Sequence, residues 1–334
     1  RMVLLTQTDP FSIDLYLADV ETGEIQGRLA SVRSNPTRFD AIAFIGTSGA
    51  WSPDGGSYAF VTYAEGENEI AIADVSDRSV RRTYEVSGIG AVYGLAWSPD
   101  GVRIAFAGSR GGVTDLFLLD LESGDFRALT EDRNSEWHPA WSPDGARLAF
   151  ATDRGPGTDF RRLSFQDAGI GIMDVESGHV RVLRPFGSTK HIDPSFSPDG
   201  GSVYYVANPD GFNDVYRTDL GSGDTFRLTR VATGVSGITD MSAALSVARE
   251  TGRLVFLVYS DDGYAVVTRG PDAALGERVG EITVAGAGTA PAATLPPLAP
   301  AGIQLVSSYL GNPTRGLPPV DPGWGIRDYE GGLR

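Results

Sequence analysis

The sequence predicts an all-β protein, a six-bladed β-propeller of four-stranded antiparallel blades, and three observations point to this fold class. A string of Trp or Phe followed by Ser-Pro-Asp-Gly recurs at intervals of 44 to 55 residues, starting at Trp51, Trp97, Trp141 and Phe196. Short β-rich segments separated by Gly and Asp turns follow each string. Some of these segments, such as 116–119, are apolar at every position, which indicates a sheet covered on both faces. Such a sheet, repeated with this period, is typical of a propeller blade.

Each repeat contains the same four strands, and the third repeat shows them most clearly. Its strands are expected at 94–97, 103–107, 115–120 and 125–129. The first turn begins at Ser98, and its Ser-Pro-Asp-Gly sequence suits a type I turn. The turn between the third and fourth strands ends at Gly124, which supplies the positive φ that a short hairpin needs.

Counting the repeats gives six blades, of which the first and the last are irregular. The last begins near Leu245 and has Arg249-Glu250-Thr251-Gly252 where the others have Pro-Asp-Gly. Arg1 aligns with the residue that follows a Ser-Pro-Asp-Gly turn, so we expect the first blade to lack its first strand. The chain is therefore expected to be a processed or partial piece of a longer protein.

The composition changes after the propeller. We expect the propeller to span 1–285, a Pro/Ala/Gly linker to span 286–301 and a C-terminal extension to span 302–334. The extension contains Tyr309, Trp324 and Tyr329, and aromatic residues in an irregular segment suggest docking on the propeller or on a partner. A strand at 302–310 that completes the first blade is the alternative, because closure would remove an exposed edge.

Charge and composition exclude several functions. The formal net charge of −15 argues against nucleic acid and against an acidic membrane surface. No apolar run is long enough to span a membrane as a helix. The absence of cysteine excludes thiol catalysis, disulfides and thiolate metal sites.

We find no motif for catalysis, a metal or a cofactor, and we expect none of the three. The serines in 46–50 and 234–238 do not satisfy Gly-x-Ser-x-Gly, and no His-Glu-x-x-His is present. The repeated turn aspartates lack the spacing of a calcium loop and are expected to bond their own turn backbone.

A group of polar residues is expected at the mouth of the central channel. His138 and Asp193 occupy the same position of the repeat, three residues before the aromatic residue of the innermost strand, and Trp137, Lys190 and His191 lie just upstream. These residues form either a partner-binding site or an ordinary solvated rim. Acid–base chemistry by a His–Asp pair would require contact between the two side chains.

Loop lengths indicate which face of the propeller binds a partner. The connections 31–46, 153–169, 184–192 and 230–243 vary in length, and a propeller places all of them on one face. Variable loops on a rigid scaffold usually carry function, so we expect a partner to bind there. Arg161 and Arg162, in the longest insertion, are candidates for pairing with an acidic peptide or a neighbouring loop.

The Trp-Ser-Pro-Asp-Gly strings resemble the WD40-like repeats of the TolB-type propeller found in bacterial cell envelopes. More narrowly, 235–239, 244–248 and 251–256 resemble the propeller of large envelope proteins, in which a peptidase-like domain precedes the propeller and a surface-antigen-type barrel follows it. The resemblance covers roughly residues 1–270.

This resemblance implies a non-enzymatic protein-binding or scaffold propeller in the periplasm or outer envelope of a Gram-negative-type bacterium. Association with the membrane would then be through protein partners. One alternative is a membrane-extrinsic structural subunit of an integral-membrane complex. The other is a propeller accessory to a hydrolase or lyase, which would depend on His138 and Asp193.

Overall fold

All regular structure in the described part of the protein is β-strand. The computed structural model describes residues 1–9, 12–32, 39–260, 263–271 and 276–280, which lie in the compact unit Arg1–Val284. No α-helix occurs in these ranges, and no helix there is long and apolar enough to cross a membrane. The predicted all-β class is confirmed.

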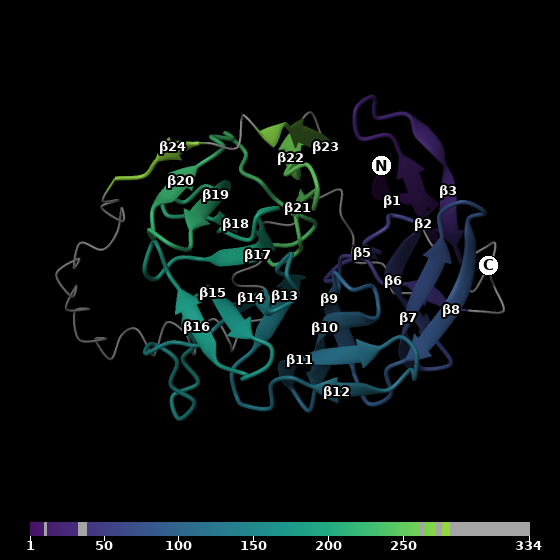
Figure 1. The fold of residues 1–334 in the computed structure, drawn as a ribbon, viewed down its shortest axis with the longest axis horizontal. Helices are drawn as coiled ribbons and strands as arrows, with labels where there is room; N and C mark the ends of the chain where they lie inside the picture. The colour runs from purple at the N-terminus through teal and green to yellow at the C-terminus, as the bar shows by residue number, and fades with distance from the viewer. Residues whose placement is uncertain (10–11, 33–38, 261–262, 272–275, 281–334) are drawn as a thin grey trace, which may run out of the picture. The chain divides into compact units, whose positions relative to one another are not determined.

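The strands form six antiparallel sheets in chain order, which are the blades (Figure 1). The first blade contains β1 (Met2–Asp9), β2 (Ser12–Ala18) and β3 (Ile25–Ser31). The second contains β4 (Ala41–Ile42), β5 (Ala50–Trp51), β6 (Ser57–Ala64), β7 (Glu67–Asp74) and β8 (Ser79–Glu85). The third contains β9 (Ala91–Trp97), β10 (Arg103–Arg110), β11 (Val113–Asp120) and β12 (Phe126–Ala128).

The fourth blade contains β13 (Glu136–Trp141), β14 (Arg147–Thr152), β15 (Gly169–Asp174) and β16 (Val180–Leu183). The fifth contains β17 (His191–Phe196), β18 (Ser202–Ala207), β19 (Asp214–Asp219) and β20 (Thr225–Arg227), with β24 (Glu277–Arg278) added on its outer edge. The sixth contains β21 (Leu245–Val247), β22 (Leu254–Ser260) and β23 (Gly263–Arg269). Six blades were predicted, and six are present, although the first and sixth have three described strands rather than four.

The innermost strands of successive blades contact one another. β5 contacts β9, β9 contacts β13, β13 contacts β17 and β17 contacts β21 (Figure 1). Apolar side chains fill the space between each blade and the next, as in the cluster of Trp141, Leu118 and Phe150 between the third and fourth blades. The core is therefore a series of layers between sheets, and both faces of the central sheets are buried.

The repeated turn owes its form to its own side chains. In the fourth blade, the Ser142 hydroxyl accepts a hydrogen bond from the backbone N–H of Arg147 at 2.9 Å, and the Asp144 carboxylate accepts one from Ala146 at 3.0 Å. Gly145 has φ of +71°, which few other residues adopt without strain. The hydrogen bond from Ser142 is the first cause that lowers the pKa of Asp144. The turn aspartates thus bond their own turns, as predicted.

Candidate functional site

The innermost strands share a bulge at the repeat position that the sequence singled out. Pairing with the second strand shifts between Trp137 and Ala140 in β13 and between Ile192 and Ser195 in β17. His138 and Asp193 lie inside these bulges with φ of +52° and +56°. Such angles are uncommon for residues other than glycine, and they are concentrated at functional sites.

His138 lies in the interior of the protein. Its side chain is 5% exposed, and its Nδ1 has no hydrogen-bond partner in the described structure. Burial lowers the pKa of His138 to about 4, although a hydrogen bond with the backbone of Met241 opposes this effect. His138 is therefore neutral at physiological pH and faces the connection that contains Met241.

Asp193 joins the fifth blade to the sixth. Its Oδ2 accepts hydrogen bonds from the backbone N–H groups of Ala244 and Leu245 at 2.7 and 2.6 Å. The side chain is 7% exposed, and burial raises the pKa of Asp193 to about 6. Its carboxylate is thus occupied with backbone amides of the neighbouring blade.

The raised pKa of Asp193 predicts a loss of stability as the pH rises. Between about pH 4 and pH 6 the folded chain binds this proton more tightly than the unfolded chain does, so the free energy of unfolding falls across this window by up to about 3 kcal/mol. The variant Asp193→Asn keeps an oxygen acceptor but cannot ionise, so its stability should not show this fall. Urea denaturation of both proteins from pH 4 to pH 7 measures the difference. Parallel stability curves would rule out this role of Asp193.

The other predicted rim residues on the fifth blade are also buried. His191 is fully buried, stacks on Phe186 with 5.7 Å between ring centroids, and places Nδ1 3.1 Å from the carbonyl oxygen of Ala168. Burial lowers the pKa of His191 to about 4. Lys190 is 8% exposed, and its ammonium group donates to the carbonyl oxygen of Asp240 at 3.0 Å and to the Asp240 carboxylate.

One connection brings the rim residues together. The segment 230–243, which joins the fifth blade to the sixth, provides Asp240 to Lys190 and Met241 to His138. Its Ser242 hydroxyl donates to the carbonyl oxygen of Ile45 in the second blade at 2.5 Å. The same segment is therefore fixed to the second, fourth and fifth blades. We call 230–243 the bridging connection.

The other three predicted site residues, Trp137, Arg161 and Arg162, do not contact the bridging connection through any hydrogen bond or ion pair described above. Trp137 is half-buried and packs against the apolar cluster between the fifth and sixth blades. Arg161 and Arg162 are exposed in the connection between β14 and β15. Arg162 lies 3.7 Å from the Asp159 carboxylate within the same loop. The structure thus brings His138 and Lys190 to the bridging connection and Asp193 to the residues directly after it, but leaves the arginines on a separate loop.

Buried acidic residues that the sequence analysis did not single out lie next to the rim. Glu136 is fully buried, pairs with Arg154 at 2.9 Å and accepts a hydrogen bond from Thr130. Burial raises the pKa of Glu136 to about 8, against the opposing attraction of Arg154. No group of three or more side chains suited to a metal ion exists within the described ranges.

Asp115 and Asp214 lie near the start of the third strands of two blades, and each accepts a hydrogen bond from a threonine fifteen residues later, Thr130 and Thr229. The same Asp–Thr spacing can be read in both repeats of the sequence. It is the signal from which these two hydrogen-bonded pairs could have been predicted. The predicted tail residues Tyr309, Trp324 and Tyr329 lie outside the described residues.

Comparison with known proteins finds a propeller family that matches part of the chain. Residues 34–170 match the family model described as the TolB beta propeller domain. No curated protein matches the sequence. Among solved structures, TolB from Acinetobacter baumannii is 22% identical with a TM-score of 0.61, over 78% of this chain and 58% of that one. The chain therefore spans little more than half the length of that relative.

Two further structures show how widely the fold is shared. A putative TolB from Agrobacterium tumefaciens is 20% identical with a TM-score of 0.59, over 80% of this chain and 87% of that one. An oligogalacturonate lyase from Vibrio parahaemolyticus is 14% identical with a TM-score of 0.52, over 80% and 71%. At these identities the similarity shows a common fold, and it carries no information about activity. The resemblance seen in the repeats is nevertheless confirmed, because residues 34–170 match the TolB propeller model and the described residues share the propeller fold of both TolB structures.

Proposed function

We propose that the chain is a non-enzymatic propeller of the bacterial cell envelope that binds a protein partner on its variable-loop face. This face is defined by the connections between second and third strands and by those between successive blades. In an antiparallel blade these connections share one end of the sheet, and the two short turns of each repeat share the other. The similarity to TolB supports both the protein-binding role and the location.

The observation that carries the proposal is the distribution of exposed apolar side chains. Ten large apolar residues are exposed in the described ranges, and only Ile25 and Val102 lie at the short-turn end. The other eight lie in the variable connections or at strand ends beside them: Ile45, Tyr63, Leu163, Phe165, Phe212, Ile238, Tyr259 and Tyr264. Exposed apolar groups gathered on one face are typical of a surface that binds another protein.

The connection between β14 and β15 contributes most to this surface. Leu163 is 73% exposed and Phe165 is 56% exposed, beside the exposed Arg161 and Arg162. Aromatic and arginine side chains contribute most of the binding energy at many protein interfaces. The bridging connection adds Ile238, which is 51% exposed and lies close in sequence to Asp240 and Ser242, the residues that contact Lys190 and Ile45.

Matched variants on the two faces test the proposal. We expect the double variant Leu163→Asp, Phe165→Asp to capture its envelope partner at least about tenfold less than the wild type does, because apolar contacts are replaced by charge. The control variant Ile25→Asp, Val102→Asp carries the same change of charge at the short-turn end and should capture the partner normally. Quantitative mass spectrometry of material bound to the immobilised full chain measures both.

Two outcomes would count against a binding role for this face. One is a wild-type chain that recovers no partner at stoichiometric yield, and the other is equal loss in both double variants. Recovery of integral-membrane proteins alone would favour the narrower role of a membrane-extrinsic subunit. A role in a hydrolase or lyase would instead require turnover that falls in His138→Ala and in Asp193→Asn.

A further inference from the structure

The third strand of the sixth blade is less buried than the corresponding strands of the third and fourth blades. In the third blade, β11 has six consecutive buried residues, and in the fourth blade β15 has five. No residue of β23 is buried, although it holds the same position in its sheet. The cause is that no strand pairs with the outer edge of β23 in the described part of the chain.

The strand that the repeat predicts for this edge pairs with the neighbouring blade. In the third, fourth and fifth blades the fourth strand begins six residues after the third ends, and β24 begins eight residues after β23 ends. β24 nevertheless pairs with β20, with Phe226 opposite Arg278 and Arg227 opposite Glu277. Among the described residues, the fifth blade thus has five strands and the sixth has three, with no outermost strand.

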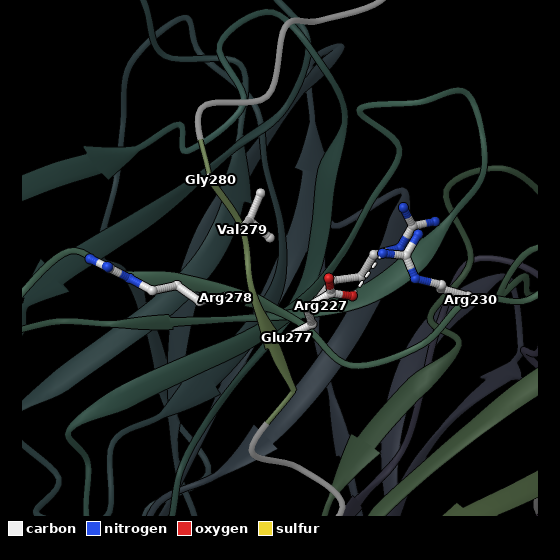
Figure 2. A pocket seen from close by; sticks show the side chains of 6 residues that line it. All are labelled: Arg227, Arg230, Glu277, Arg278, Val279 and Gly280. Atoms are coloured by element: carbon white, nitrogen blue, oxygen red, sulfur yellow. Dashed lines mark hydrogen bonds and ion pairs between the residues drawn. The ribbon is translucent and has the colours of Figure 1, made fainter.

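Several contacts hold β24 in this place. The backbone N–H of Val279 donates to the carbonyl oxygen of Thr225 at 2.8 Å, and Val279 packs against the cluster between the fourth and fifth blades. Figure 2 shows Glu277 facing Arg230, with which it forms an ion pair at 2.8 Å. Arg278 pairs with Asp224. Backbone pairing, apolar packing and two ion pairs therefore hold β24 on the fifth blade.

The edge of β23 has the chemistry of an unfilled strand position. Its residues Ala265, Val266 and Val267 are half-buried, and Val267 packs against the apolar cluster between the fifth and sixth blades. An exposed row of backbone N–H and C=O groups beside apolar side chains is a template for another strand. Tyr264, half exposed at one end of β23, is fixed by a hydrogen bond from its hydroxyl to the carbonyl oxygen of Gly237 at 3.0 Å.

The filled blades indicate what would fit this position. The fourth strand of the third blade reads Phe126-Arg127-Ala128, and that of the fifth blade reads Thr225-Phe226-Arg227 and is followed by Leu228. Their Phe residues pack against the apolar clusters, with an Arg between apolar neighbours. A net charge of −15 attracts a basic segment and disfavours a second copy of the same chain.

We propose that the outer edge of β23 binds an extended, basic segment of a partner protein, which adds a fourth strand to the sixth blade. The segment carries apolar residues at alternate positions with Arg or Lys between them. Backbone hydrogen bonds supply affinity, and the apolar residues cover Val267 and its neighbours. This surface is a strand edge, distinct from the loops proposed above to bind a partner, and the two share only Tyr264 at the end of β23.

Hydrogen exchange with a defined peptide tests the proposal on the full chain. The probe is a synthetic peptide with the sequence of residues 222–230, which copies the fourth strand of the fifth blade and carries a net positive charge. At saturation, exchange in 263–269 should slow about tenfold, while exchange in β12 and β16 stays unchanged. A peptide with Pro in place of its first Arg should have no effect, because Pro donates no hydrogen bond to a strand.

Charge variants at one position test the preference for a basic segment. Thr268→Arg should weaken binding of the probe several-fold, and Thr268→Glu should strengthen it, as measured by fluorescence anisotropy. The matched control is Thr83→Arg, on the exposed outer strand β8, which should leave binding unchanged. Both sites are on strand surfaces, so all variants are expected to fold.

Three results would overturn the proposal. The first is absence of binding up to about 1 mM peptide, and the second is slowed exchange at another edge instead of 263–269. The third is slowed exchange in 263–269 that depends on protein concentration without peptide, which would identify a second copy as the occupant. None of these results bears on the loop variants Leu163→Asp and Phe165→Asp, so the two proposals fail separately.

Discussion

Truncation of Trp141 to alanine is expected to lower the free energy of unfolding by about 3–5 kcal/mol, because a large buried side chain leaves a cavity that its neighbours cannot fill. Trp141 is 7% exposed and lies between the third and fourth blades with Leu118 and Phe150. Its indole N–H donates to the carbonyl oxygen of Ala96 at 3.1 Å, so the variant also loses a hydrogen bond between blades. Urea denaturation followed by fluorescence or circular dichroism measures the change.

Two controls separate burial from repetition. Trp51 holds the same repeat position but is only half-buried, so Trp51→Ala should cost less than Trp141→Ala. Trp141→Phe keeps most of the apolar volume and loses the N–H, so its effect should lie between that of the alanine variant and zero. Equal losses in Trp51→Ala and Trp141→Ala would show that the cavity argument is wrong for this propeller.

Removal of the Asp214 carboxylate should destabilise the fifth blade by about 3–5 kcal/mol, because it takes a fully buried acceptor away from three donors and leaves Arg227 with only its exposed partner Asp210. Asp214 is fully buried and pairs with Arg227, whose side chain is 15% exposed. It also accepts hydrogen bonds from the Thr229 hydroxyl at 2.5 Å and from the backbone N–H of Val231 at 3.0 Å. Asp214→Ala leaves all three donors without this acceptor.

Asp210 provides the matched control, since it pairs with the same Arg227 at 2.6 Å but is 40% exposed. Asp210→Ala should cost less than about 1 kcal/mol, because water screens the pair and replaces the carboxylate. Chemical denaturation of both variants under the same conditions gives the comparison. A cost for Asp210→Ala as large as that for Asp214→Ala would mean that burial does not set the strength of these pairs.

The fold was predictable because its signals are local. The Ser hydroxyl of each repeated turn accepts a backbone hydrogen bond five residues later, as Ser98 does from Arg103 and Ser197 from Ser202. The turn is thus encoded within one short string, and its spacing sets the blade. The same alignment placed His138 and Asp193 at one equivalent position, and both have the same left-handed backbone.

The parts that sequence reasoning missed depend on contacts between distant segments. The sequence could not show that the bridging connection would lie against Lys190, because the contact with Asp240 joins residues fifty positions apart. The place of β24 was equally hidden, since its spacing suits the sixth blade and its ion pair with Arg230 belongs to the fifth. No short sequence motif encodes either contact.

The bridging connection also has a consequence for the order of folding. The hydrogen bond from Ser242 to Ile45 joins residues 197 positions apart, so the second to fifth blades, which lie between the two residues, should be in place before it forms. Contacts of such long sequence separation form late and slow the final step of folding. During synthesis the early blades leave the ribosome before Ser242 does, and their open ring exposes strand edges and apolar faces until the contact closes. The rate of that closing step should therefore determine how long the nascent chain is prone to aggregate.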